Sequence, residues 1–142
     1  MEERDATSVF QLMKALAQHE GQSEYLKIDL DTFKSHAFKD QPSLGAVVAE
    51  QHGQLIGYVS YTINFSIWLG AAYMQVDDVY VMPDFRSAGV GRQLMQGVKE
   101  DAKRLKLPLI RWGVEKDNVK AIAFYKRLGA TYKEKGLCNW YI

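Results

Sequence analysis

The sequence is poor in cysteine, in long hydrophobic runs and in excess charge of either sign. Cys138 is the only cysteine among 142 residues, which excludes an intrachain disulfide and a cysteine-based structural zinc site. The longest nearly uninterrupted apolar stretch, residues 55–63, falls far short of the ~20 residues that cross a bilayer. Eighteen basic and seventeen acidic residues leave a net charge of +1, without the positive excess that binding to nucleic-acid phosphates requires. We therefore expect neither a membrane span nor a nucleic-acid partner.

Targeting signals and metal-ligand patterns are also missing from the sequence. The first five residues, Met-Glu-Glu-Arg-Asp, are acidic and lead into no apolar core of a signal peptide. The histidines at positions 19, 36 and 52 lack the spacing of a metal site. We expect a cytoplasmic protein that holds no metal.

Hydrophobic periodicity predicts a mixed α/β fold in a single domain, residues 1–142. Apolar residues at helical spacing predict a helix over residues 8–19, a short one that starts after Asp29 or Asp31 and ends before Pro42, and one from Val90. A further helix is predicted with Asp117 or Asn118 as its N-cap and Gly129 at its C′ position. Period-two patterns predict a hairpin that turns at His52-Gly53. The strands are expected over residues 46–50, 54–65, 73–82, 109–114 and 137–142.

The most informative segment joins a predicted strand to the helix at Val90. Residues 79–92 read Val-Tyr-Val-Met-Pro-Asp-Phe-Arg-Ser-Ala-Gly-Val-Gly-Arg. Gly89 and Gly91 allow a ligand to approach the backbone closely, and the amides at a helix start stabilise a phosphate. A P-loop is excluded because no Gly-Lys-Ser/Thr is present, and Leu94 stands where a dinucleotide fingerprint has its third glycine. By itself, the pattern describes a glycine turn at a helix start equally well.

The pattern Arg86-x-x-Gly89-x-Gly91 after a strand and Pro83 resembles the acyl-CoA pyrophosphate signature of the GNAT superfamily of acetyltransferases. Residues 118–130 resemble the second helix motif of that superfamily, and Gly57 with the β-run after it resembles its central hairpin. Within the superfamily the chain is most similar to the diamine acetyltransferases of the spermidine/spermine and thialysine type. That likeness rests on residues 16–20, 68–70, 77–82 and 124–127.

The resemblance implies a GNAT-type fold, which is a mixed, mostly antiparallel twisted sheet flanked by helices. It also implies an enzyme that transfers an acetyl group from acetyl-CoA to an amine by direct attack in a ternary complex, and a homodimer. In this chain only a few polar residues stand before the first helix, where the superfamily usually has an opening strand. The first strand of the fold is therefore not predicted here.

Acetyl-CoA is expected to contact three segments. The amides of Val79 to Val81 are implied to bind the acyl carbonyl and the pantetheine arm, and the glycine loop to bind the pyrophosphate. Asn118 is implied to contact the CoA arm, although its position equally describes a helix cap. The full expected set is Val79, Tyr80, Val81, Arg86, Ser87, Ala88, Gly89, Val90, Gly91, Arg92, Asn118, Ala121 and Tyr125.

Two residues are expected to handle protons. An acceptor amine with a pKa near ~10 is almost entirely protonated at pH 7, so a base is needed. The resemblance places that base at Asp77, acting through water, and strict alternation along a strand puts Asp77 on the side of Val79 and Val81 with Asp78 opposite. Tyr125 is the candidate acid for the CoA thiolate, although an aromatic on a helix face equally describes core packing.

The acceptor is expected to be a small primary amine, either diamine-like or amino-acid-like. The resemblance places contacts with the substrate amine at His19 and Glu20, together with Asp77. Glu134-Lys135 lies where the diamine enzymes carry more acid, which weakens a polyamine assignment. Two alternatives remain open: an acceptor on a protein or peptide, and a GNAT fold that binds acyl-CoA without catalysis. Cys138 is expected to be a buried strand residue.

Overall fold

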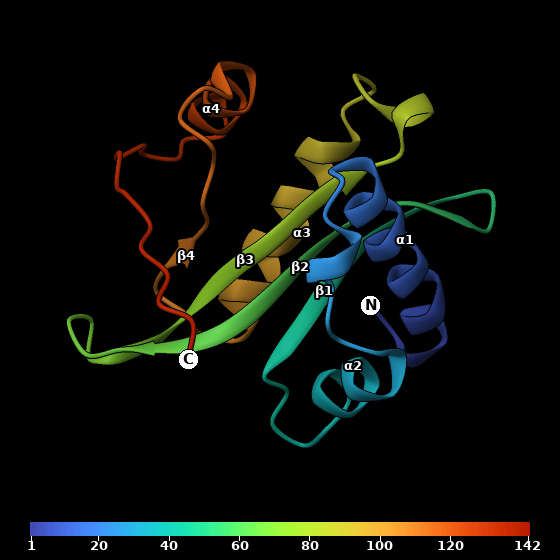
Figure 1. Cartoon of the computed structure of the whole chain (residues 1–142), viewed down its shortest axis with the longest axis horizontal. Helices are drawn as coiled ribbons and strands as arrows, with labels where there is room; N and C mark the ends of the chain where they lie inside the picture. The colour runs from blue at the N-terminus through green and yellow to red at the C-terminus, as the bar shows by residue number, and fades with distance from the viewer. The chain divides into compact units, whose positions relative to one another are not determined.

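The computed structural model describes all residues 1–142, and the chain divides into two compact units, Met1–Trp112 and Gly113–Ile142. The larger unit carries every strand and most helices, and the smaller unit carries one helix (Figure 1). The elements of the larger unit are η1 (Glu3–Asp5), α1 (Ala6–His19), η2 (Ser23–Tyr25), α2 (Leu30–Ala37), β1 (Leu44–Gln51), β2 (Gln54–Ser66), β3 (Ala71–Val81), η3 (Pro83–Phe85), α3 (Val90–Arg104) and β4 (Ile110–Arg111). The smaller unit contains α4 (Val119–Arg127).

The strands form one sheet in the order β1-β2-β3-β4. The first three strands are antiparallel, and β4 runs parallel to β3 through two residue pairs only, Met74 with Ile110 and Gln75 with Arg111. The β1–β2 turn lies at His52 and Gly53, with φ values of 52° and 79°. Positive φ at both central residues is the geometry that matches the twist of a two-residue hairpin. The predicted hairpin is thus confirmed.

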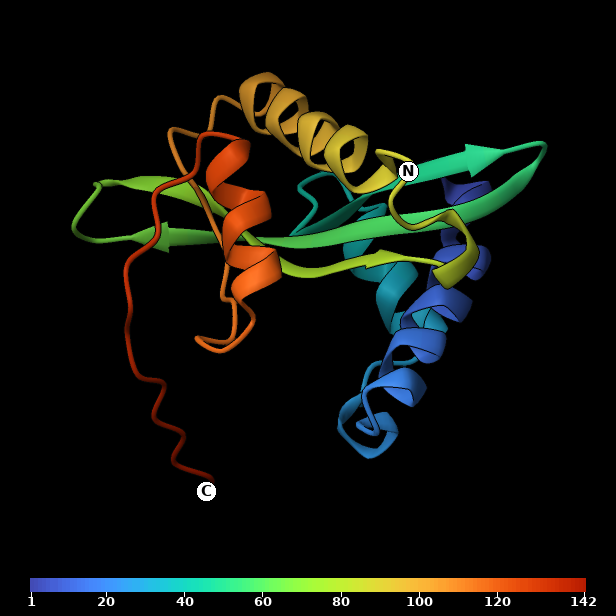
Figure 2. The ribbon, with the colours of Figure 1, turned by 90° about the horizontal axis from the view of Figure 1, so that it is seen from above.

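Helices cover both faces of this sheet (Figure 2). On one face, Phe10 of α1 and Phe33 of α2 belong to one buried cluster with Tyr58 and Tyr80 of the sheet. On the other face, α3 packs so closely that a Cβ on its Gly97 would stand 2.7 Å from a methyl carbon of Val47. The mixed, mostly antiparallel sheet flanked by helices confirms the predicted fold class.

The predicted caps also hold. Asp29 accepts a hydrogen bond of 2.7 Å from the amide of Thr32 at the start of α2, and Asn118 accepts one of 3.1 Å from the amide of Ala121 in α4. Gly129 follows α4 with φ of 91°, as a glycine at the C′ position does. α1 begins at Ala6, ahead of the predicted start near Ser8.

Two predicted strands differ from the structure. Residues 137–142 form no strand, and Cys138 is exposed rather than buried. The strand predicted over residues 109–114 is reduced to the two residues of β4. β-rich composition becomes a strand only where a neighbouring edge supplies hydrogen-bond partners. Residues 112–114 and 137–142 form no such ladder.

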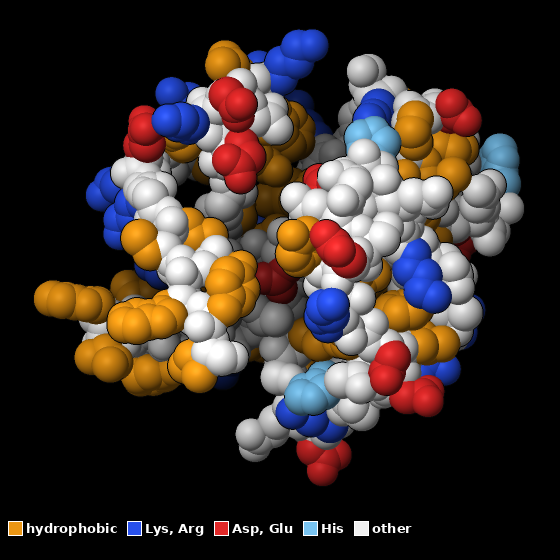
Figure 3. Space-filling model, in the orientation of Figure 1, with side chains coloured by type: hydrophobic (Ala, Val, Ile, Leu, Met, Phe, Trp, Pro, Cys, Tyr) orange, Lys and Arg blue, Asp and Glu red, His pale blue; other side chains and the backbone are white.

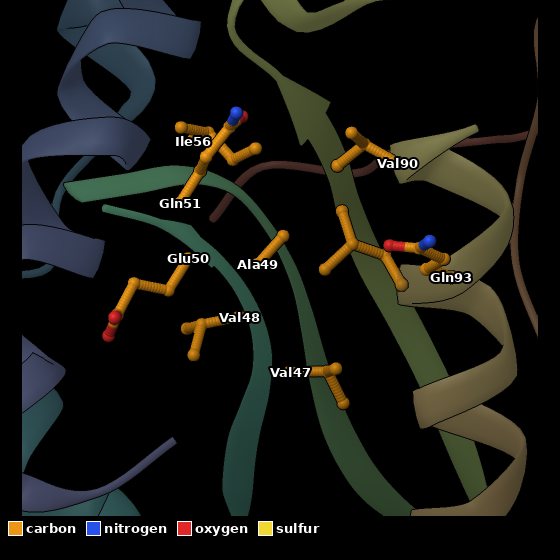
Figure 4. A pocket seen from close by; sticks show the side chains of 9 residues that line it. Val47, Val48, Ala49, Glu50, Gln51, Ile56, Val90 and Gln93 are labelled. Atoms are coloured by element: carbon orange, nitrogen blue, oxygen red, sulfur yellow. The ribbon is translucent and has the colours of Figure 1, made fainter. Parts of the chain in front are cut away.

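No strand precedes α1, so β1 is an edge of the sheet. A groove of about 420 Å³ follows that edge beside the start of α3. Figure 4 shows the lining residues on the two strands of the hairpin and on α3, with the side chains of Val48 and Glu50 directed away from α3. They are Val47, Val48, Ala49, Glu50, Gln51, Ile56, Val90, Gln93 and Leu94. None of the helices is both long and apolar enough to span a bilayer.

Candidate active site

The glycine loop leaves the end of β3 and enters α3 through residues with left-handed backbone. Ser87 has φ of 64° and Gly89 has φ of 86°, and Gly89 is the N-cap of α3 with no side chain capping the helix. The amides in the first turn of a helix have no intrahelical acceptor. Val90, Gly91 and Arg92 therefore present their N–H groups at the positive end of a 15-residue helix, which is a favourable place for a phosphate.

Arg86 ties this loop to the strand. Its Nε donates a hydrogen bond of 2.9 Å to the carbonyl of Val81, and its guanidinium carbon lies 5.9 Å from the ring centroid of Tyr80. Arg92 is exposed in the first turn of α3. Arg86 and Arg92 thus stand on either side of the start of α3 in the sequence, and the Arg86 side chain links the loop to the end of β3.

The edge of β3 next to the loop is open on one side. β4 pairs with β3 only at Met74 and Gln75, so no strand follows the outer edge of β3 from Val76 to Val81. The amide of Met82 bonds to the carbonyl of Ile56, and hydrogen-bonded and non-bonded pairs alternate along an antiparallel ladder. The amides of Val79 and Val81 consequently point to the open edge.

Tyr80 differs from these two valines. It is paired with Tyr58 in the β2–β3 ladder, and by the same alternation its amide points toward β2. Of the three amides expected to contact acetyl-CoA, those of Val79 and Val81 are thus available to a ligand, and that of Tyr80 is used within the sheet.

A β-bulge places Asp77 and Asp78 on the same face of the sheet. Tyr61 pairs with Val76 and Ser60 pairs with Asp78, so Asp77 is an extra residue in β3. The expectation that strict alternation puts Asp77 beside Val79 and Val81, with Asp78 opposite, is wrong. An inserted residue breaks the period of two and redirects the neighbouring side chains.

Hydroxyl groups on β2 identify the face that both carboxylates share. Asp78 Oδ2 accepts hydrogen bonds from Ser60 Oγ at 3.0 Å and from Tyr58 Oη at 3.4 Å, and Thr62 lies close enough to Asp77 to oppose the rise of its pKa. These three β2 residues alternate along the strand, so they point to one side. Because Tyr58 packs in the cluster with α1, that side is the one covered by α1 and α2.

Burial and neighbouring charges raise the pKa values of Asp77 and Tyr58. Asp77 is partly exposed to solvent. The surrounding protein nevertheless removes enough hydration to raise the pKa of Asp77 to about 6. The negative charge of Asp78 raises this pKa further, and Thr62 lowers it. Burial is the largest cause that raises the pKa of Tyr58, followed by Asp78, and the charge of Glu20 also contributes. The negative charge of Glu20, at the end of α1, therefore reaches the Tyr58 hydroxyl that bonds to Asp78.

His19 lies one residue earlier than Glu20, in the last turn of α1, and its side chain is exposed. No three His, Cys, Asp or Glu side chains lie together in an arrangement that would hold a metal ion. The larger unit therefore carries two charged features near the end of β3: the glycine loop with the first turn of α3, which is positive, and the carboxylates of Asp77 and Asp78.

The smaller unit carries the other residues expected at the site. Asn118 is the N-cap of α4, and the amide of Ala121 is its hydrogen-bond partner, so the structural role predicted for Asn118 is confirmed. Tyr125 is half-buried, its ring centroid lies 5.2 Å from that of Phe124, and burial raises its pKa. A phenol with a raised pKa keeps its proton at neutral pH and can serve as an acid.

Sequence reasoning missed Tyr58, Ser60 and Thr62. A signal was present, because hydroxyl side chains recur there at every second position of an otherwise apolar strand. Ser60 is buried, with 6% of its surface exposed, and a buried hydroxyl requires a polar partner. That partner, Asp78, became visible only when the strands were paired.

Comparisons with known proteins agree with this geometry. Residues 8–130 match the Acetyltransferase (GNAT) family. Thialysine N-epsilon-acetyltransferase from Mus musculus is 30% identical over 136 residues, which cover 90% of this chain and 79% of the relative.

Two solved structures share the fold. Ribosomal-protein-alanine N-acetyltransferase from Brucella melitensis biovar Abortus 2308 superposes with a TM-score of 0.73 at 20% identity, over 99% of this chain and 96% of that one. An aminoglycoside N-acetyltransferase in complex with CoA gives a TM-score of 0.72 at 20% identity, over 100% and 96% of the two chains. The family match spans both units, and with it the chain is placed in the GNAT family of acetyltransferases, as an N-acetyltransferase.

Proposed function

We propose that this enzyme transfers the acetyl group of acetyl-CoA to a primary amine of a small, positively charged acceptor. The observation that carries the proposal is the β-bulge, which sets Asp77 and Asp78 side by side on one face of the sheet. Glu20 adds a third negative charge close by. Adjacent carboxylates favour ammonium groups, and thialysine N-epsilon-acetyltransferase, a relative of this chain, is named for an amino acid that carries a side-chain amine.

The donor is proposed to bind along the glycine loop and the open edge of β3. The pyrophosphate would accept hydrogen bonds from the first-turn amides of α3, beside Arg86 and Arg92. The amides of Val79 and Val81 point to the open edge and can donate to the pantetheine arm and to the acetyl carbonyl. A fixed amide donor at that carbonyl would stabilise the oxyanion that forms during attack.

In the proposed reaction, the amine nitrogen attacks the acetyl carbonyl carbon, the C–S bond breaks, and CoA leaves as a thiolate. The acceptor arrives as an ammonium ion and must first lose a proton, which Asp77 would take directly or through water. A pKa of about 6 leaves Asp77 ionised at neutral pH and therefore able to accept it. Tyr125 would give a proton to the thiolate sulfur. The second proton, which the attacking nitrogen loses as the amide forms, would pass through water to restore Tyr125, and the proton on Asp77 would go to solvent.

An acceptor screen tests this proposal. The enzyme should release CoA thiol from acetyl-CoA in the presence of diamines and basic amino acids, as measured with a thiol reagent. Turnover of peptides alone would favour the alternative in which the acceptor is a protein. Binding of acetyl-CoA without turnover of any amine would favour a non-catalytic acyl-CoA module.

We further propose that residues 1–142 act as a single catalytic domain, in the cytoplasm, and as a homodimer. Hydrophobic side chains reach the surface around the β2–β3 connection (Figure 3), where Ile67 is 90% and Trp68 is 99% exposed. Exposed apolar groups of this kind are typical of surfaces that contact another protein.

A further inference from the structure

The two carboxylates of the bulge are held in different ways. Asp78 receives two hydroxyl donors from β2, Ser60 Oγ at 3.0 Å and Tyr58 Oη at 3.4 Å. Both donors bond to the same oxygen, Oδ2. No group of the protein donates to Oδ1, which is therefore the oxygen left for a ligand. Asp77 is more exposed than Asp78, and the nearby Thr62 hydroxyl lowers its pKa.

The two donors are themselves rigidly placed. Tyr58 is fully buried, at 0% exposure, and its ring centroid lies 6.2 Å from that of Tyr80. Ser60 is buried at 6% exposure and stands directly opposite Asp78 in the β2–β3 ladder. The Tyr58 ring cannot move to follow a displaced carboxylate without disturbing the packed core, and Ser60 Oγ can move only between the staggered positions about χ1. Two hydrogen bonds from β2 thus hold Asp78 Oδ2 in place, an arrangement called the clamp below, and they orient Oδ1 of the same carboxylate.

We propose that Ser60 and Tyr58 are positioning residues that clamp Oδ2 of Asp78 and so aim its Oδ1 at the second, non-reacting ammonium group of a dicationic acceptor. This inference rests on the proposed function and assigns separate tasks to the two aspartates. Asp77 takes the proton from the reacting amine, and Asp78 binds the charge at the other end of the acceptor. The charge of Glu20, at the end of α1, is close enough to act on Tyr58 and adds to the attraction for cations.

The alternative is that Ser60 and Tyr58 only stabilise the fold by satisfying a half-buried carboxylate. A purely structural role would affect all acceptors and the melting temperature alike. A positioning role affects acceptors that carry a second ammonium group and spares those that lack one. Putrescine and butylamine form a matched pair of probes, because they share a four-carbon chain and one reacting amine.

The test measures kcat and KM for both amines, the dissociation constant of putrescine by calorimetry in the presence of CoA, and the melting temperature. Ser60→Ala should raise KM and the dissociation constant for putrescine about tenfold, which corresponds to ~1.4 kcal/mol and to the loss of one hydrogen bond to a charged group. Tyr58→Phe, which removes the longer bond, should raise them by about threefold. For both variants, kcat with putrescine and kcat/KM with butylamine should stay within about threefold of wild type.

Two controls accompany these variants. Ser35→Ala deletes a serine hydroxyl that bonds only within α2 and should change nothing. In an Asp78→Asn background, Ser60→Ala should add less than about threefold to the putrescine KM, because the charge that the clamp directs is already gone.

The outcomes separate this inference from the proposed function. If wild type acetylates putrescine but Ser60→Ala binds it as tightly as wild type, the positioning role is overturned and the proposed function stands. An equal loss for putrescine and butylamine, with a lower melting temperature, also overturns it in favour of a structural role. If wild type binds putrescine and acetylates no amine, the proposed function fails. The dissociation constants of putrescine for Ser60→Ala and wild type then still show whether Ser60 positions Asp78. A wild type that does not bind putrescine overturns both.

Discussion

At the scale of single residues, the proposed reaction depends on two ionisable side chains, one in each unit, that their own surroundings keep in opposite protonation states. Asp77 has a pKa raised to about 6 and is ionised at neutral pH, whereas burial raises the pKa of Tyr125 and keeps it protonated. A base and an acid of this kind are what amine acetylation needs at its beginning and at its end. Each makes a separate prediction.

Substitution of Asp77 by Asn should depress kcat/KM most near neutral pH. Wild type should lose activity as the pH falls through about 6, because protonation removes the base. The pH-rate profile of the variant should lack this acidic decline, because Asn does not ionise. The variant should be ~10²–10⁴-fold slower near pH 7 and recover as the pH approaches the amine pKa of ~10. A pH-rate profile, with the exposed Asp40→Asn as control, measures this; a loss that is equal at all pH values would indicate positioning instead.

The stability of the same variant separates catalysis from folding. The pKa of folded Asp77 lies above the ordinary value of 3.8, so its ionisation opposes folding progressively as the pH rises from about 4 to 6, and the full penalty is present above 6. Asn carries no charge. The melting temperature of Asp77→Asn at pH 7 should therefore equal or exceed that of wild type, as differential scanning fluorimetry would show.

Removal of one oxygen tests Tyr125. Tyr125→Phe should lower kcat by ~10²–10⁴-fold while the affinity for acetyl-CoA stays within a few-fold, because the ring remains and only the acid is lost. Tyr132→Phe removes a phenol oxygen from the same unit and should leave kcat unchanged. If chemistry limits the rate and the kcat of Tyr125→Phe lies within threefold of wild type, Tyr125 is not the acid and solvent protonates the thiolate.

At the scale of elements, the site is assembled where β3 meets the glycine loop and α3. The bulge at Asp77 turns two carboxylates to one face, and the short β4 leaves the amides of Val79 and Val81 at an open edge. The helix that follows supplies free amides at its positive end. Three irregularities of regular structure, namely a bulge, an unpaired edge and an uncapped helix start, thus lie within about fifteen residues of sequence.

The loop can be tested with two glycines of similar geometry. Gly89 and Gly53 have φ of 86° and 79°, and a Cβ at either would meet no atom within 4 Å. Alanine at either position should cost about 1–2 kcal/mol through backbone strain. Only Gly89→Ala should raise the dissociation constant for CoA, by at least about tenfold, because its methyl group lies in the loop proposed to hold the pyrophosphate. Equal CoA affinities of the two variants by calorimetry would disprove the loop's role.

At the scale of the whole molecule, the protein combines a larger unit that contains the sheet with a smaller unit that contains α4. The groove along the β1 edge and the apolar side chains around the β2–β3 connection are surface features of the larger unit. In the smaller unit, Leu137 and Trp140 are 86% and 95% exposed. A chain of this size with so much exposed aromatic surface is typical of a subunit in an oligomer.

Light scattering should give twice the chain mass of 16.2 kDa at micromolar concentration. The physical reason is that association removes exposed apolar side chains such as Trp68 from water. Replacement of both Ile67 and Trp68 by Ser should shift the equilibrium toward monomer if the β2–β3 connection is part of the interface. A wild-type mass of 16.2 kDa across that concentration range would exclude the dimer.

The sequence by itself determined the features that depend on local chemistry. The α3 pattern, the caps at Asp29 and Asn118, the turn at His52-Gly53 and the glycine loop were all predictable, because each depends on residues close together in the chain. The family resemblance followed from the same local motifs, and the family match confirms it.

Only the tertiary structure decided which face the carboxylates occupy and which strands exist. A bulge is a property of a strand pair, so Asp77 and Asp78 could not be assigned to one face until β2 was aligned with β3. Ser60 and Tyr58 became partners of Asp78 through that same pairing. Likewise, residues 137–142 have strand composition and form no strand, because hydrogen bonds in a sheet come from a neighbour that the local sequence does not contain.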